Sequence, residues 1–360
     1  MATMKALHQT AWGSATDVFQ FGPVPAPGEP SSTQVRVRVV AASLNPVDIK
    51  RADGFANKMG LANDVFPVVI GYDVAGTVDA VGSEVTRFRV GDAVFGDIHA
   101  VSIATRTAGT VAESVLAEEA VLAKKPDALS WTDAAALPVA LLTSLDSFQT
   151  VKLSRGEKLL VTAGAGGVGH LGIQLAKSDL FKAGTVATTA SPAKTEFVKA
   201  CGADVVVDYR SSSVEAELSN YDAVMELAGD MEGALKVLSP AAAGRMAAVA
   251  TFETDDRWTF IQLAPTGADL ERVLPVVMSG QVKPTVKVFP FDEAGVKAAV
   301  AEMAGGRALG KVVIAMPDAT DANDTAARPA IPASVTANRP TGAAEAAHPP
   351  PEGPAASSAA

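Results

Sequence analysis

A glycine-rich segment, LLVTAGAGGVGHLGIQLAK at residues 159–177, constrains the fold of this chain more than any other feature. An apolar run typical of a strand precedes the glycines, and an amphipathic run typical of a helix follows them. Between a strand and a helix, such glycines permit a tight turn and close approach of a pyrophosphate, while the free N–H groups of the helix attract an anion. The segment therefore predicts a dinucleotide-binding loop. Its contacts are expected from Gly164, Gly166, Gly167, Val168 and Gly169.

Strand-like and helix-like runs alternate after this loop, from GTVATTAS at 184–191 to GRMAAVATF at 244–252. This alternation predicts a parallel sheet with right-handed crossovers, whose strands are apolar because helices cover both faces. The first third of the chain is different. QVRVRVVAAS at 34–43 alternates apolar and charged residues, and short strands separated by glycine turns predict a small β-barrel. The chain is therefore expected to be an α/β protein.

These patterns predict two domains and a tail. Residues 1–122 form the barrel domain, residues 123–265 form the dinucleotide domain, and residues 266–316 return to the barrel. Residues 317–360 contain no aromatic residue and are dominated by Ala, Pro, Thr and Ser, so they are expected to be disordered.

Composition restricts the partners. A net charge of −10 without clustered Lys and Arg argues against nucleic acid or an anionic membrane surface as a partner. Cys201 is the single cysteine, so the chain can form neither an intrachain disulfide nor a zinc site that needs two thiolates. The expected role of Cys201 is simple packing. No apolar run is long enough to span a membrane. A soluble, cytoplasmic protein is expected.

The second strand of the parallel sheet indicates which dinucleotide binds. NAD sites usually end this strand with an acidic residue that binds the ribose hydroxyls, but here it ends TTASPAK at 188–194. Ser191 and Lys194 suit a 2′-phosphate, and Tyr209 offers a phenolic donor or a face for the adenine. The predicted cofactor is NADPH.

Six segments together resemble the medium-chain dehydrogenase/reductase superfamily, in its zinc-free quinone oxidoreductase branch. They are ASLNPVDIKRADG, FPVVIGYDVAGTVDAVG, RFRVGDAVFGD, VTAGAGGVG, GADVVVDY and GRALGKVVI. The resemblance extends from about Met4 to Met316 and is greatest to plant-type alkenal/enone oxidoreductases. It implies a GroES-like β-barrel catalytic domain plus a Rossmann doubly wound parallel sheet that binds the nucleotide. It also implies reduction of the C=C bond of α,β-unsaturated carbonyls by NADPH.

The same resemblance predicts that no metal takes part. Zinc alcohol dehydrogenases of this superfamily carry a Cys and a His at the positions that here hold Asn45 and Tyr72. Neither side chain is a good zinc ligand, so zinc catalysis is not expected. Tyr72 is expected to fill the vacated metal pocket.

Two residues of the LNPVDIKR segment are the candidate catalytic residues. The resemblance places Asn45 near the nicotinamide ribose or the substrate, and Lys50 close to the nicotinamide. Partial burial would lower the pKa of Lys50, whose ammonium could then stabilise an enolate oxygen or donate a proton. The alternative is a surface lysine beside Arg51. Asp48 is expected to be structural, because a carboxylate beside an enolate would be unfavourable.

Other residues have weaker assignments. His170, in the first turn after the glycine loop, is expected to be an exposed helix residue and not a catalytic one. The resemblance implies further cofactor contacts from Gly229, Ala250, Thr251, Leu309, Gly310 and Lys311.

The combined interpretation is an NADPH-dependent, zinc-independent reductase of a small-molecule enone, enal or quinone. An enoyl-thioester reductase of a biosynthetic pathway and a non-catalytic NADPH-binding protein remain alternatives. A homodimer is one option for its assembly, through sheet extension at an edge strand near GRMAAVATF.

Overall fold

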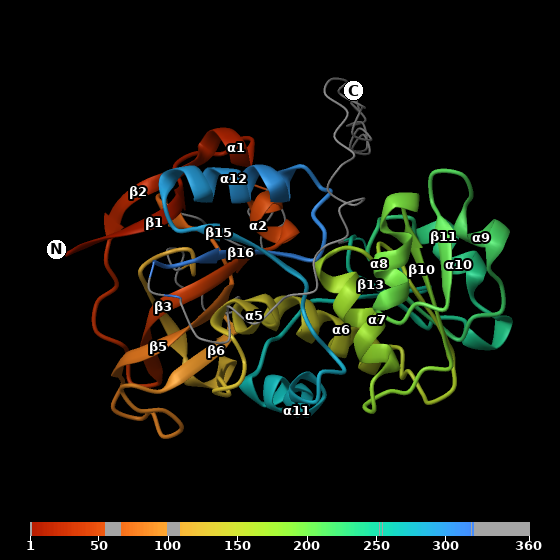
Figure 1. The fold of residues 1–360 in the computed structure, drawn as a ribbon, viewed down its shortest axis with the longest axis horizontal. Coiled ribbons are helices and arrows are strands. Elements are labelled where there is room, and N and C mark those ends of the chain that lie inside the picture. The colour runs from red at the N-terminus through yellow and green to blue at the C-terminus, as the bar shows by residue number, and fades with distance from the viewer. Residues whose placement is uncertain are drawn as a thin grey trace, which may run out of the picture. The chain divides into compact units, whose positions relative to one another are not determined.

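The structure is a computed structural model that describes residues 2–54, 66–98, 109–251, 253, 255–317 and 319. Its first lobe is built on a seven-stranded sheet with the order β15-β16-β3-β5-β6-β8, in which β7 also pairs with β3 (Figure 1). A three-stranded sheet, β2-β1-β4, accompanies it. These sheets contain β1 (Thr3–Gln9), β2 (Phe19–Pro25), β3 (Gln34–Leu44), β4 (Val68–Val69), β5 (Asp73–Val81), β6 (Ala93–Asp97), β7 (Ser114–Glu118), β8 (Leu122–Lys124), β15 (Val286–Pro290) and β16 (Lys311–Ala315).

Strand β3 lies at the centre of this lobe, where it pairs with β5, β7 and β16, and its apolar side chains alternate with charged ones. Val35, Val37 and Val39 are buried in the core, whereas Arg36 and Arg38 are at least partly exposed. This is the pattern expected of a strand with one face on a core and the other toward water.

The second lobe is built on a six-stranded, fully parallel sheet with the order β11-β10-β9-β12-β13-β14. Its strands are β9 (Lys158–Val161), β10 (Thr185–Ala190), β11 (Val205–Asp208), β12 (Ala223–Glu226), β13 (Met246–Ala248) and β14 (Thr259–Phe260). After β9, the strands β10 and β11 extend the sheet on one side of β9. The strands β12, β13 and β14 then extend it on the other side. The switch point between β9 and β12 is where open α/β sheets bind their ligands.

The edge strand of this sheet differs from the expected one. β13 lies within the GRMAAVATF segment, but it is an inner strand because β14 pairs with it. Sheet extension would therefore have to use β14 and not β13.

Helices connect and cover the strands of both sheets. They are α1 (Ala15–Val18), α2 (Pro46–Arg51), α5 (Trp131–Ala136), α6 (Pro138–Thr150), α7 (Gly167–Lys177), α8 (Thr195–Ala200), α9 (Val214–Glu217), α10 (Met231–Val237), α11 (Gly267–Met278) and α12 (Glu293–Ala304), with short 3₁₀ turns η1 (Glu119–Val121), η2 (Pro192–Lys194) and η3 (Pro240–Ala242). The break between α5 and α6 falls at Leu137, directly before Pro138, as expected for a residue that precedes proline. Within the described ranges, no helix is long and apolar enough to cross a bilayer.

The chain after residue 266 rejoins the sheet of the first lobe. β16 pairs antiparallel with β3, with Val312 opposite Leu44, and β15 pairs parallel with β16. The domain boundaries at residues 122, 265 and 316 remain a prediction. The tail predicted to be disordered, residues 317–360, lies outside the described residues except for Pro317 and Ala319.

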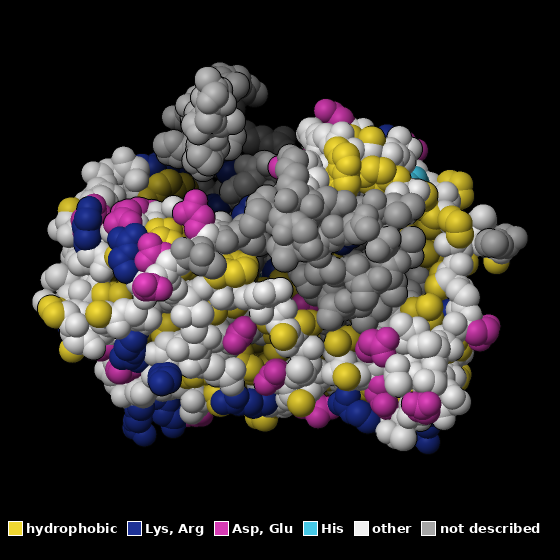
Figure 2. Space-filling model, turned by 180° about the vertical axis from the view of Figure 1, so that it is seen from behind, with side chains coloured by type: hydrophobic (Ala, Val, Ile, Leu, Met, Phe, Trp, Pro, Cys, Tyr) yellow, Lys and Arg dark blue, Asp and Glu magenta, His cyan; other side chains and the backbone are white. Residues whose placement is uncertain are grey.

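Charged side chains of both signs cover the surface. On the face shown in Figure 2, Lys and Arg side chains are interspersed with Asp and Glu. Ion pairs among the described residues include Arg36 with Asp79 and Arg87 with Glu271, each at 2.7 Å. Exposed pairs of this kind contribute little to stability.

The structure corrects the expectation for His170, which is fully buried at 0% exposure. Its Nδ1 lies 2.8 Å from the carbonyl oxygen of Gly166, and its Nε2 accepts a hydrogen bond from the backbone N–H of Thr285 at 3.1 Å. These partners require the neutral ring with the proton on Nδ1. His170 is therefore a structural residue that connects the glycine loop to the segment before β15.

This burial predicts a pH-dependent stability. Burial lowers the pKa of His170 to about 4, whereas the ordinary value is 6.5. Between these values the unfolded chain binds a proton that the folded chain does not, so stability falls as the pH falls through this window. Between about pH 7 and pH 5, the free energy of unfolding should fall by about 2 kcal/mol more in the wild-type chain than in the His170→Gln variant. Urea unfolding at both pH values measures this, and equal losses in the two proteins would contradict the assignment.

Candidate active site

The glycine loop joins β9 to α7 in a conformation that only glycine fits at two positions. A Cβ at Gly164 would lie 2.0 Å from Thr188 Oγ1, and one at Gly169 would lie 2.4 Å from the carbonyl oxygen of Ala163. Gly164 thus lets the loop contact β10, and Gly169 lets α7 pack on the loop. A Cβ at Gly166, the N-cap of α7, would meet only that same oxygen, at 3.4 Å. The loop therefore has room for a ligand beside Gly166, at the start of an 11-residue helix.

A group of cations lies near the end of β10. This strand ends at Ala190 and is followed by the buried Ser191. The Lys194 ammonium donates to the carbonyl oxygen of Arg307 at 2.9 Å. Burial lowers the pKa of Lys194, and the positive charges of Arg210 and Arg307 lower it further, against the opposing effect of Glu302. Positive charges that repel one another in this way favour binding of an anion.

Of this cation group, sequence reasoning found Lys194 but missed Arg210 and Arg307. Arg210 directly follows Tyr209, which is 59% exposed, and Arg307 lies within the GRALGKVVI segment. The signal that could have identified them was their position, directly after GADVVVDY for Arg210 and within GRALGKVVI for Arg307.

A buried polar network, formed by Ser43, Asn45, Asp73 and Lys311, lies where β16, β3 and β5 meet. The Lys311 ammonium donates to Asp73 Oδ2 at 3.0 Å and to Asn45 Oδ1. The same carboxylate oxygen accepts from Asn45 Nδ2 at 2.9 Å and from Ser43 Oγ at 2.6 Å. All four residues are at most 4% exposed. The network therefore satisfies a buried charge of each sign.

This network also contacts the second lobe. Asp73 Oδ1 accepts the backbone N–H of Val139 at 2.7 Å, near the start of α6. The Gly310 N–H donates to the carbonyl oxygen of Ala165 in the glycine loop at 3.0 Å. A Cβ at Gly167 would lie 3.0 Å from Lys311 Cδ. The structure thus brings Asn45, Gly310 and Lys311 together beside the glycine loop. The sequence patterns named these three residues but did not predict that they meet.

Helix α2 carries the remaining residues of the LNPVDIKR segment. The buried Asp48 accepts the backbone N–H of Asn45 at 2.7 Å, so it caps the helix that Asn45 begins. Burial raises the pKa of Asp48 to about 7, the Asn45 N–H opposes this, and the Asp73 carboxylate raises it further. These contacts fit the structural role expected of Asp48. Lys50 is exposed, as in the alternative of a surface lysine, so the structure does not provide the partial burial on which the argument for a lowered pKa depended.

Asn45 and Tyr72 occupy the two positions where the zinc enzymes carry Cys and His. Each of these two side chains is hydrogen-bonded to a cationic neighbour. Asn45 Oδ1 binds the Lys311 ammonium, and the Tyr72 hydroxyl accepts from Arg51 Nη1 at 2.9 Å. Burial raises the pKa of Tyr72 to about 12, which disfavours a phenolate ligand. Among the described residues no three His, Cys, Asp or Glu side chains form a metal-binding group. This donor set does not fit a zinc ion.

The loops after β12 and β13 carry the other candidate cofactor residues. Gly229 has a φ of +94°, and a Cβ there would meet nothing within 4 Å. Ala250 and Thr251 follow β13 and are half-buried.

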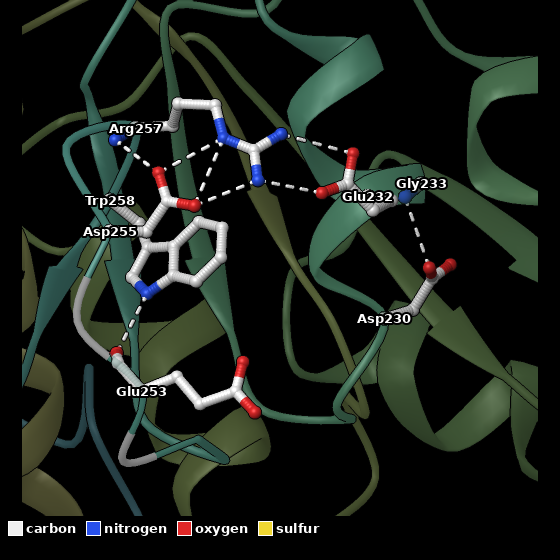
Figure 3. A network of polar contacts seen from close by, with 7 residues as sticks. All are labelled: Asp230, Glu232, Gly233, Glu253, Asp255, Arg257 and Trp258. Atoms are coloured by element: carbon white, nitrogen blue, oxygen red, sulfur yellow. Dashed lines mark hydrogen bonds and ion pairs between the residues drawn. The ribbon is translucent and has the colours of Figure 1, made fainter. Parts of the chain in front are cut away.

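Arg257 lies between β13 and β14 and pairs with two carboxylates (Figure 3). Its guanidinium pairs with Asp255 and with Glu232, in each case at 2.8 Å. Because Glu232 belongs to α10, these contacts attach the loop after β13 to the helix that follows β12.

The chain is similar in sequence to known proteins. Residues 31–127 match the family model "Alcohol dehydrogenase GroES-like domain", and residues 201–314 match "Zinc-binding dehydrogenase". A 2-methylene-furan-3-one reductase from Solanum lycopersicum is 39% identical over 315 residues, which are 86% of this chain and 79% of that protein. The NADPH-dependent alkenal/one oxidoreductase, chloroplastic, of Arabidopsis thaliana is 38% identical, with coverage of 78% and 72%.

Solved structures show the same fold. The quinone oxidoreductase from Coxiella burnetii has a TM-score of 0.77 and 30% identity, and the match covers 87% of this chain and 99% of that one. The CurK enoyl reductase has a TM-score of 0.75 and 25% identity, with the same coverage. The predicted combination of a GroES-like barrel domain and a Rossmann parallel sheet is confirmed. The chain is an oxidoreductase that belongs to the medium-chain dehydrogenase/reductase superfamily, in its quinone oxidoreductase branch.

Proposed function

We propose that this chain uses NADPH to reduce the C=C bond of an α,β-unsaturated carbonyl compound, or a quinone, without a metal ion. The observation that carries the proposal is the contact of the Asp73–Lys311 network with the glycine loop, because it places a buried ammonium and carboxylate beside the loop to which we assign the nucleotide. The names of the similar alkenal/one and quinone oxidoreductases support the same chemistry.

The glycine loop fits the pyrophosphate of a dinucleotide, since Gly166 leaves space and α7 offers free N–H groups. When bound, NADPH would supply the hydride. Beyond the loop glycines and Val168, its proposed contacts are Ser191, Lys194, Tyr209, Gly229, Ala250, Thr251, Leu309, Gly310 and Lys311. We add Arg210 and Arg307, because their charges act on Lys194.

On the substrate side, we assign different roles to the two candidate catalytic residues. The Asn45 amide is already bonded to Asp73 and Lys311, so it would orient the ribose or substrate from a fixed position. For Lys50, an exposed residue in the last turn of α2, we retain the role that the resemblance implies: its ammonium would stabilise the enolate oxygen or donate a proton to it.

Assembly and location remain predictions. A homodimer would pair along β14, the edge of the parallel sheet. We retain a cytoplasmic location as a proposal, although the names of similar plant proteins include the word chloroplastic.

The coenzyme proposal predicts a selective loss in Lys194→Ala. This variant should raise the KM for NADPH about tenfold, as expected when one charge-assisted bond to a phosphate is lost. The KM for NADH should not change, because NADH lacks the 2′-phosphate. Lys199→Ala is the matched control, since Lys199 lies on α8 and pairs with Glu196. An equal effect of Lys194→Ala on both coenzymes would contradict the assignment.

The reaction itself is tested by following NADPH oxidation with a short enal, a cyclic enone, a quinone and an enoyl thioester. We expect turnover with the first three. With the enone, Lys50→Ala should lower kcat about a hundredfold, the usual effect of removing one donor to a developing oxyanion, while Lys50→Arg retains most activity.

Each of the other outcomes has a defined meaning. Turnover of the enoyl thioester alone would favour the alternative reductase, and NADPH binding without any turnover would favour a non-catalytic protein. Unchanged kcat in Lys50→Ala would remove Lys50 from the mechanism.

A further inference from the structure

Glu226, the last residue of β12, is a fully buried carboxylate at 0% exposure. It accepts hydrogen bonds from three consecutive backbone N–H groups, those of Ala228 at 2.8 Å, Gly229 at 2.9 Å and Asp230 at 3.2 Å. Its second oxygen also accepts from Gly229, at 3.0 Å. The turn that follows β12 is therefore folded around the side chain of its own preceding residue.

Thr162 connects this carboxylate to the glycine loop. Its hydroxyl donates to Glu226 Oε1 at 3.1 Å and accepts the backbone N–H of Leu227 at 2.6 Å. Thr162 follows β9 directly and lies two residues before Gly164. The Thr162 hydroxyl thus links the turn after β12 to the loop after β9, in addition to the backbone hydrogen bond from the Thr162 N–H to the Met225 carbonyl oxygen at 3.1 Å.

An ordinary turn does not need a buried charge. A carboxylate loses much hydration free energy on burial, and within the described residues Glu226 forms no ion pair that would offset this loss. Its compensation comes from the N–H groups of the turn and from Thr162, so the charge is stable only while the turn holds this one conformation. The arrangement restricts the turn more tightly than neutral turn residues would.

The location of the turn indicates what this restriction serves. β9 and β12 are neighbours at the switch point of the parallel sheet. Ala228, Gly229 and Asp230 are exposed, and the space around Gly229 is open. Asp230 then caps α10 by accepting the N–H of Gly233 at 3.0 Å, as Figure 3 shows. The fixed turn thus presents its backbone to the region beside the glycine loop.

We propose that Glu226 is a positioning residue for the coenzyme. Together with Thr162 it holds the Ala228–Asp230 turn in one conformation beside the glycine loop. Coenzyme binding then does not have to offset the entropy cost of ordering this turn. This inference rests on the proposed NADPH function, because it requires a coenzyme at the glycine loop. Neither Glu226 nor Thr162 touches the reacting atoms in this account. Their effect on the coenzyme is transmitted through the turn.

The test compares Thr162→Val, Thr162→Ser and Glu226→Gln in the full-length chain. Glu157→Gln is the matched control, because Glu157 is a half-buried carboxylate directly before β9, at the opposite end of the same strand, where it pairs with Arg245 at 2.7 Å. Fluorescence titration gives the Kd for NADPH, steady-state kinetics with a cyclic enone give kcat and both KM values, and thermal unfolding gives the Tm.

We expect Thr162→Val to raise the Kd and KM for NADPH about tenfold, the change typical of losing a hydrogen bond to a charged group. The KM for the enone should stay near the wild-type value. Thr162→Ser, which keeps the hydroxyl, should restore NADPH binding. Glu226→Gln should weaken binding at least as much as Thr162→Val, because its amide NH₂ opposes the N–H groups of the turn.

Three results would overturn the inference: wild-type NADPH binding in Thr162→Val, an equal loss in Thr162→Ser, or an equal loss in Glu157→Gln at a similar Tm. If Glu226→Gln does not fold, the Thr162 pair decides the question alone. A wild-type chain that fails to bind NADPH in the same titration would instead contradict the proposed function. The two failures are therefore distinguishable.

Discussion

The buried ion pair between Lys311 and Asp73 is the interaction on which the site depends. Removing one partner of such a pair typically costs about 3–5 kcal/mol, because the other charge is left buried and unpaired. Here the pair also holds Asn45 and Ser43, and through Asp73 it contacts the first turn of α6. It therefore joins the end of β3, the starts of β5 and β16 and the start of α6 in one polar network.

This unit connects the two chemical tasks that we assign to the protein. Coenzyme binding belongs to the glycine loop, which receives Gly310 and the aliphatic part of Lys311 from the barrel strand β16. Substrate orientation belongs to Asn45, which is held by the same ammonium. Behind the loop, Glu226 and Thr162 form a second buried polar unit within the parallel sheet. Each unit satisfies a buried carboxylate with hydrogen bonds from backbone and side-chain donors, and so holds the segments that carry those donors.

Local patterns were sufficient to predict the parallel sheet with its connecting helices and the position of the glycine loop between a strand and a helix. The strand, glycines and helix of residues 159–177 are contiguous, so their spacing alone indicates the loop. The Asp73–Lys311 contact could not be read in this way, because it needs the register of β16, β3 and β5 and joins residues 238 positions apart. His170 shows the same limit: its burial depends on Thr285, 115 positions away. Likewise, the sequence pattern does not indicate that β14 pairs with β13.

The central claim is that a protein ammonium and carboxylate, and no metal ion, form the polar site beside the coenzyme. The most direct test is elemental analysis of the purified full-length chain together with enone-dependent NADPH oxidation by the same preparation, before and after exhaustive chelation. We predict full activity at negligible zinc content and no loss on chelation. Activity that rises and falls in proportion to bound zinc would contradict the account.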